Sequence, residues 1–443
     1  MEETRAAGPA FVVDAGNLYW KSPTLAQGMR PQQERKAALI AEAFALAGVD
    51  AMAPGAGDLA LGIDFVKGLV EKHHLPYVAA NLECPGKGAP FAPFVVAEKG
   101  GVTLAFVGVV GETVKHSGCA ATDPVAAVRA AIAGVEADAF VVLSNEKIED
   151  DERLAAAVPE IGLVVNGQER RQLPTPKGLS NGGLLLASGS RGKQLGVLKI
   201  SLVAGASQWR DDDVRDEAVA KRDKSRARVE DLEARREKES DGRAKDRLQK
   251  QIDFFEREIA EAESELARLD ASSGPAHAVK NSLRDLGTDV KDHPKTAELV
   301  AAAKVALGET VTETTPALPT SPYAGSAACA ACHAPETTQW KGTAHARAYA
   351  SLKAANREKD QDCFSCHVTG ASHPQGPQQP GAVAGLEDVG CESCHGPGKA
   401  HVADPKAPMT RDPAVETCTT CHDGKQDGGR FDFGTYRPKV VHG

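Results

Sequence analysis

The chain has 443 residues, with 52 Lys and Arg against 61 Asp and Glu, a formal charge of −9, and 42% hydrophobic but 5% aromatic residues. This composition excludes a disordered or collagen-like chain, and the length exceeds one compact core and indicates two or three domains. The acidic balance argues against nucleic-acid binding, and no apolar run approaches the roughly 20 residues that span a bilayer.

Residues 1–210 alternate β-like and helical runs. Apolar runs predict strands at 10–13, 77–80, 102–110, 140–143, 163–165 and 195–203, and helical periodicity is found at 32–47, 59–73 and 123–136. Because strands and helices alternate, we expect an α/β domain in which helices cover a sheet. The glycines at 55, 57 and 62 have the wrong spacing for a dinucleotide-binding loop, and no acidic residue follows at the required distance.

Several strings in this region resemble the calcineurin-like metallophosphoesterase domain of 5′-nucleotidases. They are Val12-Val-Asp14-Ala-Gly16-Asn17, the segment 49–62, Asn81-Leu82, Phe106-Val-Gly108, Val142-Leu-Ser-Asn145, Val164-Val-Asn-Gly167-Gln-Glu-Arg170 and Gly192-Lys-Gln-Leu-Gly196. The resemblance implies an α/β metallophosphoesterase-like sandwich. Members of the family hold two metal ions through Asp-x-His, Gly-Asp, Gly-Asn-His-Glu, Ser-His and Gly-His-x-His motifs, and the first of these has no counterpart here.

The sequence also departs from the other four motifs. Asn17 stands at the Asp position, Ala56-Gly57 at the Asn-His pair, Asn145 at the Ser-His position, and Gln168 and Arg170 in the last motif. A two-metal centre needs several carboxylates and imidazoles to hold both cations and activate a water. We therefore expect a scaffold that is catalytically inactive. A ligand pocket at the same sheet edge and a redox-linked 5′-nucleotidase are the alternatives.

Residues 211–270 are dense in charge and predict an antiparallel coiled-coil hairpin. The apolar positions step by 4 and 3 along one helix, with a weaker seam on its partner before a break at 240–242. The two seams are Leu248, Ile252, Phe255, Ile259, Ala262, Leu266 and Leu269, and Val214, Ala218, Ser225, Val229 and Leu232. The charged faces are expected to be solvated, with docking as the alternative. The acidic run 211–213 favours a helix start over a metal site.

Two connecting segments follow the hairpin. Residues 271–309 are expected to return as helix to the first domain. Residues 310–325 are rich in Thr and Pro and lack periodicity, which indicates a semi-rigid linker. The remaining domain is then residues 326–443.

Eight of the ten cysteines lie beyond Ser321 and form four C-x-x-C-H motifs, the signature of haem c attachment. The motifs are Cys329, Cys332 and His333; Cys363, Cys366 and His367; Cys391, Cys394 and His395; and Cys418, Cys421 and His422. Two thiols three positions apart reach the two vinyl groups of one porphyrin, and the adjacent imidazole then points at the iron. We therefore expect four covalently bound haems c.

Other chemistries of paired cysteines fit this pattern less well. A structural zinc site does not need a His directly after every pair. A disulfide scaffold would not repeat one pentapeptide four times, and no βαβ pattern indicates a thioredoxin-like redox pair.

The second axial ligand of each iron separates electron transfer from catalysis. Four further histidines, His345, His373, His401 and His442, lie beyond residue 320, so the candidates equal the haems in number. This count favours iron atoms closed by two histidines, which carry electrons. His373 is the weakest candidate because it lies in a loop with Gly and Pro. If it is not a ligand, the second haem is expected to be five-coordinate and reactive.

This region resembles the c554-type tetrahaem cytochromes. The matching strings are the first motif with Trp340 and His345-Ala, Cys366-His367-Val-Thr-Gly370, Gly390-Cys-Glu-Ser-Cys-His-Gly-Pro-Gly398 with His401, and the fourth motif leading to Phe431 and His442. The resemblance implies a mainly α, haem-packed domain whose haems are closely stacked, mostly with two histidine ligands. Motif separations of 34, 28 and 27 residues leave little chain per haem and predict a short electron wire.

Haem c is attached outside the cytoplasmic membrane, so we expect a periplasmic or extracellular protein. The first ten residues lack the apolar segment of a signal peptide, which suggests a start inside a longer gene product or a signal already removed. Cys84 and Cys119 either pair in an oxidising compartment or are two ordinary buried thiols. The remaining histidines, His73, His74, His116, His277 and His293, have no metal-ligand spacing.

The leading hypothesis is therefore a multihaem electron-transfer protein in which an inactive phosphoesterase-like domain docks or positions the haem domain. The rival is an oxidoreductase with one open haem that acts on a small nitrogen or oxygen species. Beyond residue 320 there are 12 Lys and Arg against 13 Asp and Glu, and haem propionates add negative charge. We expect a redox partner with a basic face, and self-association through haem edges or the coiled coil is a further possibility.

Overall fold

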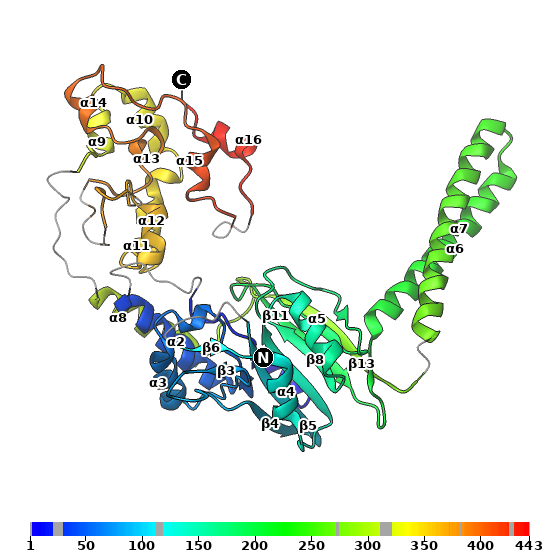
Figure 1. The fold of residues 1–443 in the computed structure, drawn as a ribbon. Coiled ribbons are helices and arrows are strands. Elements are labelled where there is room, and N and C mark those ends of the chain that lie inside the picture. The colour runs from blue at the N-terminus through cyan, green and yellow to red at the C-terminus, as the bar shows by residue number, and fades with distance from the viewer. Residues whose placement is uncertain are drawn as a thin grey trace. The chain divides into compact units, whose positions relative to one another are not determined.

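The computed structural model describes residues 2–20, 30–111, 118–271, 274–310, 321–371, 373–378, 380, 383, 385–424 and 429–442 (Figure 1). His116 and most of the expected linker, residues 311–320, lie outside these ranges. The chain divides into two compact units, Met1–Leu25 with Ile40–Lys291, and Ala26–Leu39 with Asp292–Gly443. This division differs from the expected boundaries, because ten residues of an N-terminal helix and the segment 292–309 join the unit that carries the haem motifs.

The first unit is built on a six-stranded sheet. In spatial order its strands are β4 (Phe94–Lys99), β5 (Val102–Val110), β7 (Ala139–Asn145), β8 (Ile161–Asn166), β10 (Leu184–Leu186) and β9 (Lys177–Gly178). The four inner strands are parallel and the two edge strands antiparallel. Phe106 and Leu143 belong to one buried cluster, and Val107 and Val142 to another. Because neighbouring residues of one strand face opposite sides, both faces are covered, as the continuous apolar runs require.

Helices and small sheets complete this unit and confirm the predicted α/β class. The helices are α1 (Glu2–Ala7), the 3-10 turn η1 (Gly57–Leu59), α3 (Ile63–His73), α4 (Pro124–Ile132) and α5 (Ile148–Ala157). The helix expected over 59–73 therefore begins at Ile63. The small sheets pair β1 (Val13–Asp14) with β2 (Ala51–Met52), β3 (Leu82–Glu83) with β6 (Ala120–Ala121), and β13 (Ala276–Asp285) with both β11 (Gln194–Ser201) and β12 (Gln208–Asp211).

Strand β13 occupies part of the segment 271–309, for which helix was expected. The strand lies between β11 and β12, so its backbone groups are paired on both sides. His277 and Val279 are buried while their neighbours are more exposed, which is the period of two that a half-buried strand shows. The flanking polar residues hid this alternation in the sequence.

The charged segment forms the predicted helical hairpin of α6 (Asp212–Lys238) and α7 (Gly242–Ala271), which lie side by side in Figure 1. Its seam is buried at six predicted positions, Ala218, Ser225, Leu232, Ile252, Ala262 and Leu266. Ser225 donates to Glu258 at 3.0 Å and Arg236, further along α6, donates to Gln249, which lies earlier in α7, so the helices are antiparallel. Asp211 accepts a hydrogen bond from the Asp213 amide at 3.0 Å and is the N-cap of α6.

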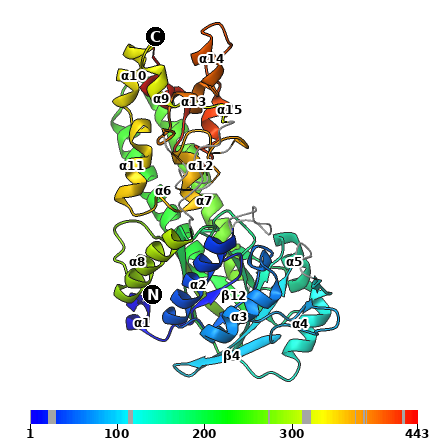
Figure 2. The same ribbon diagram turned by 90° about the vertical axis from the view of Figure 1, so that its left-hand side faces the viewer.

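The second unit consists mostly of short helices (Figure 2). Its elements are the first ten residues of α2 (Arg30–Ala47), α8 (Pro294–Glu309), α9 (Ser326–Cys329), α10 (Ala334–Lys341), η2 (His345–Arg347), α11 (Ala348–Ala354), α12 (Gln361–His367), α13 (Cys391–His395), α14 (Lys399–Ala403), α15 (Val415–Thr419), α16 (Phe433–Tyr436) and η3 (Arg437–Lys439). Tyr349, Leu352, Phe364, Val368 and Val383 form a small apolar cluster. Among the described helices, none is both long and apolar enough to cross a membrane.

Candidate haem sites and the altered phosphoesterase site

Each C-x-x-C-H motif lies on a helical turn. Helices α12 and α13 contain the second and third motifs entirely. In the first and fourth motifs, the amides of His333 and His422 donate to the carbonyls of Cys329 and Cys418, both at 2.9 Å. Residues at positions i, i+3 and i+4 share one helix face, so both thiols and the imidazole of a motif point to the same side. The eight thiols are free of disulfides, as attachment to a porphyrin requires.

Three motif histidines face three of the candidate distal histidines. The ring centroids are 6.4 Å apart for His333 and His401, 6.3 Å for His345 and His422, and 5.5 Å for His395 and His442. A metal bonded to imidazole nitrogens at about 2 Å on both sides requires ring centroids about 6 Å apart. These pairs therefore fit an iron between them, and the first, fourth and third haems would be held in this way.

Backbone carbonyls orient several of these imidazoles. The Nδ1 atoms of His367, His395 and His401 lie 2.7, 2.7 and 2.9 Å from the carbonyl oxygens of Ala348, Thr410 and Ala407. A ring whose Nδ1–H donates to a carbonyl presents the lone pair of Nε2 to a metal. The carbonyls therefore select the tautomer that iron ligation needs.

The second motif has a different distal side. In the described part of the chain, no ring contact joins His367 to another histidine. His373 instead lies against Tyr323, with ring centroids 5.7 Å apart, and its Nδ1 accepts from the Gln375 amide at 3.1 Å. The structure therefore does not bring the predicted candidate His373 to His367.

Thiols of different motifs lie close together. Cys329 is beside Cys391, and Cys366 is beside Cys421. Burial, followed by the neighbouring Cys391, raises the pKa of Cys329 to about 11, and burial raises the pKa of Cys394 to about 11. The first motif thus adjoins the third and the second adjoins the fourth, so porphyrins attached there would be neighbours. Within the described residues, no three His, Cys, Asp or Glu side chains form a metal cluster of the kind that zinc would need.

The residues that stand at the phosphoesterase motif positions meet in the first unit. Asn17 donates from Nδ2 to Gln168 Oε1 at 3.1 Å, and its Oδ1 accepts from the Gly57 amide at 3.0 Å. Asn145 donates to the carbonyl of Ala15 at 3.2 Å. A Cβ on Gly55 would lie 2.5 Å from Asn17 Oδ1, so the amide is packed tightly against this loop. Amides bonded to each other and to backbone groups occupy these motif positions.

Two carboxylates, one fully buried and one partly buried, accompany these amides. Asp58, which is fully buried, accepts from the amides of Asn17, Tyr19 and Gly55 at 2.7 to 2.9 Å and so joins the two loops. The pKa of Asp14 is raised to about 7, because burial and, to a smaller extent, the nearby Asp58 outweigh the hydrogen bond from the Gly16 amide, which lowers it. Asp58 was not among the residues predicted from the sequence. An ionised carboxylate only accepts hydrogen bonds, so an acidic residue in a glycine-rich loop is a candidate acceptor for backbone amides. Elsewhere in this unit, Cys84 and Cys119 form a disulfide, the first of the two alternatives left open.

Comparison with known proteins assigns the haem region. Residues 328–396 match the family model "Cytochrome c554 and c-prime". These residues form a cytochrome c554-type domain. Cytochrome c-554 of Nitrosomonas europaea is 36% identical over an alignment of 65 residues, which covers 11% of this chain and 28% of that protein. The chain therefore spans less than a third of the length of that curated relative. The cytochrome c554-type domain implies covalently bound haem c, and the matched residues contain the first three motifs.

Three of the solved structures that are similar to this chain come from two bacteria. One is the calcineurin-like phosphoesterase YfkN of Bacillus subtilis (14% identity, 69% of this chain and 86% of that chain, TM-score 0.45). The other two come from Thermus thermophilus. One is the sulfate thiohydrolase SoxB (23% identity, 46% of this chain and 38% of that chain, TM-score 0.40). The other is a 5′-nucleotidase precursor (19% identity, 46% of this chain and 44% of that chain, TM-score 0.39).

Proposed function

We propose that this chain is a periplasmic or extracellular electron-transfer protein in which four c-type haems form a short wire. The observation that carries the proposal is the placement of three histidine pairs at the spacing of an iron with two axial imidazoles. When bound, each haem supplies a one-electron couple. The chain's own residues hold it through two thiols, aim the imidazoles and fix their tautomers.

The first unit serves in this proposal as a catalytically inactive docking or positioning domain. Its support is the hydrogen bond between Asn17 and Gln168, which joins two amides at motif positions where carboxylates and imidazoles would be needed. The disulfide between Cys84 and Cys119 supports an oxidising compartment. Residues 321–443 contain 12 Lys and Arg against 13 Asp and Glu, and the propionates of bound haems would add negative charge, which supports a redox partner with a basic face.

A count of haems and their spin states tests the wire. The intact holoprotein is expected to contain four haems, and each of the three histidine pairs is expected to give a low-spin iron in the electron-spin spectrum. Replacing His442 by Ala should remove the ligand opposite His395 and convert one low-spin haem to high spin. His373→Ala is the matched control and should leave these low-spin signals intact. Fewer than four haems in fully matured protein, or an unchanged spectrum for His442→Ala, would contradict this arrangement.

A second candidate function is an oxidoreductase that binds a small nitrogen or oxygen species at the second haem. The observation that favours it is the contact of His373 with Tyr323 instead of His367. In the same preparation, the reduced protein should then bind one carbon monoxide per chain. Absence of carbon monoxide binding would leave electron transfer alone.

A further inference from the structure

We propose that Lys36, Gln32 and Gln33, which precede the haem motifs by nearly 300 residues or more, are positioning residues of the second haem. They lie on the first ten residues of α2, which belong to the same compact unit as α12. Helix α12 carries Cys363, Cys366 and His367. The inference rests on the proposed function in one respect, since it requires a haem at this motif.

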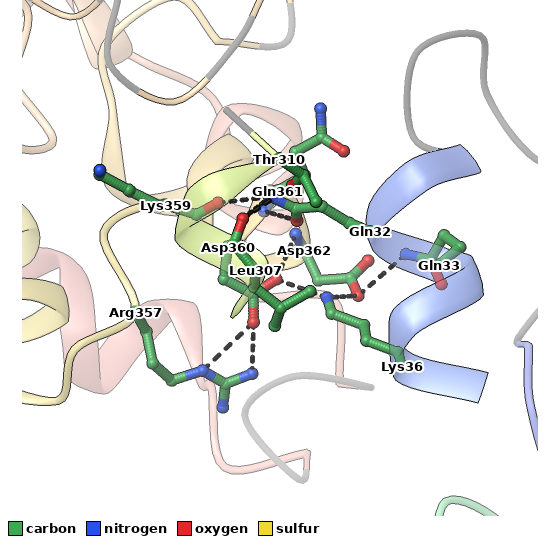
Figure 3. Close-up of polar contacts among 10 residues, drawn as sticks. All are labelled: Gln32, Gln33, Lys36, Leu307, Thr310, Arg357, Lys359, Asp360, Gln361 and Asp362. Atoms are coloured by element: carbon green, nitrogen blue, oxygen red, sulfur yellow. Dashed lines mark hydrogen bonds and ion pairs between the residues drawn. The ribbon is translucent and has the colours of Figure 1, made fainter. Parts of the chain in front are cut away.

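Lys36 holds two carboxylates at the start of α12 (Figure 3). Its ammonium nitrogen lies 2.5 Å from Asp360 Oδ1 and 2.6 Å from Asp362 Oδ2. The exposed fractions of the Lys36 and Asp360 side chains are 17% and 4%, so solvent screens this pair weakly. Lys36 is therefore a partly buried cation placed beside the attachment helix.

The two glutamines bind the same turn. Gln32, with 2% exposure, donates to the Lys359 carbonyl at 2.7 Å and accepts from the Gln361 amide at 3.0 Å. It also lies 3.4 Å from the carbonyl of Leu307 on α8, and Gln33 donates to Asp362 at 3.2 Å. The first turn of α12 is thus bound through its backbone and through its acidic side chains (Figure 3).

This turn decides whether α12 forms. The helix has seven residues, and a helix so short is unstable without tertiary contacts. Asp360 is its N-cap, accepts from the Asp362 amide at 3.0 Å and also binds Arg357 at 2.6 Å. Burial raises the pKa of Asp360, but Lys36 and then Arg357 outweigh it, and the net pKa is lowered. Lys36 and Arg357 therefore both stabilise the ionised form of this cap.

The attachment residues follow within one turn. Cys363 comes directly after Asp362, and His367 at the other end of α12 is fixed by the Ala348 carbonyl at 2.7 Å. The α2 residues hold one end of the helix and this carbonyl the other. Without the Lys36 charge, the negative charges of Asp360 and Asp362 near the second haem are no longer balanced by this cation. They would then repel the electron that reduction adds to the haem. The midpoint potential of that haem should fall.

Redox titration of the full holoprotein tests the proposal. The component of the second haem is identified as the one missing from the double variant Cys363→Ser/Cys366→Ser, so its assignment does not depend on spin state. Lys36→Met should lower the midpoint potential of this component and leave the midpoint potentials of the other three haems unchanged. Lys36→Arg should restore it. Arg30→Met, which removes a cation from an exposed pair with Glu34 on the same helix, is the matched control and should have no effect.

Other outcomes are equally informative. If Lys36→Met matures with a haem missing, peptide mass mapping should locate the loss at Cys363 and Cys366, and a loss at another motif would overturn the proposal. An unchanged titration of Lys36→Met, or an equal shift of all four haems, would also overturn it. Fewer than four haems in the wild-type protein would instead contradict the proposed function, so the two failures are distinguishable.

Discussion

At the scale of single residues, the first unit places the partly buried Asp14 and the fully buried Asp58 beside the amides at the phosphoesterase motif positions. Asp14 and Asp58 lie close together, and three backbone amides satisfy Asp58. Asn17 donates a hydrogen bond to Gln168. A carboxyl group that is buried in this way titrates at a higher pH than in the unfolded chain.

Asp14 should therefore make stability depend on pH. Its pKa is about 7 in the folded state, because burial disfavours the charge, and about 4 in the unfolded chain. Between these values the folded state binds more protons than the unfolded state, so the free energy of unfolding falls as the pH rises from about 4 to about 7 and then levels off. Urea unfolding of Asp14→Asn across this range should show a weaker fall, whereas Asp64→Asn, an exposed control, should follow the wild type. Parallel curves for Asp14→Asn and wild type would refute the assignment.

At the scale of elements, long periodic or continuously apolar patterns were predictable, whereas several shorter or mixed elements were not. The strand over 102–110 and the heptad seam of the hairpin were predicted with the residues that the structure buries. The sequence analysis missed β13 because alternating burial is masked by its charged outer residues. It also missed β4, β12 and α5. The haem motifs were recognisable because a covalent cofactor fixes residue types and spacing, whereas Lys36 carries no such local signal.

The hairpin offers a prediction about its own stability. Ile252 is 1% exposed on α7, so Ile252→Ala should leave a cavity in the seam and destabilise the hairpin by about 2 to 4 kcal/mol. Phe254 on the same helix is 50% exposed, and Phe254→Ala should cost less than about 1 kcal/mol. Hydrogen exchange of residues 212–271 measures how much protection each variant loses. The haem spectra should be unchanged in both variants. Equal protection losses in the two variants would contradict the predicted seam.

At the scale of the whole molecule, the unit that carries the haem motifs is discontinuous in sequence. It combines residues 26–39 with 292–443, and α2 runs on from residue 39 into the residues of the other unit. The sequence could not reveal this division, because the linker composition at 310–325 suggested a boundary there. The contacts of Gln32 with Leu307 and Gln361 instead join segments on both sides of it.

A cut inside residues 311–320 should therefore leave the two fragments associated. A protease site placed there separates 1–310 from 321–443, but the contacts of α2 with α12 lie between the fragments and should keep them together in gel filtration. Lys36→Met should weaken the association, while Arg30→Met should not. Fragments that separate at once in the wild type would contradict this view of the unit.

The distance along the chain between Lys36 and Asp360 also bears on folding. Their contact closes a separation of 324 residues, and contacts of such range form late because loop closure must come first. The start of α12 is thus completed only after both residues 32–36 and residues 359–362 have been made. A product without either segment lacks one side of this contact, so haem attachment at Cys363 and Cys366 is expected to depend on both.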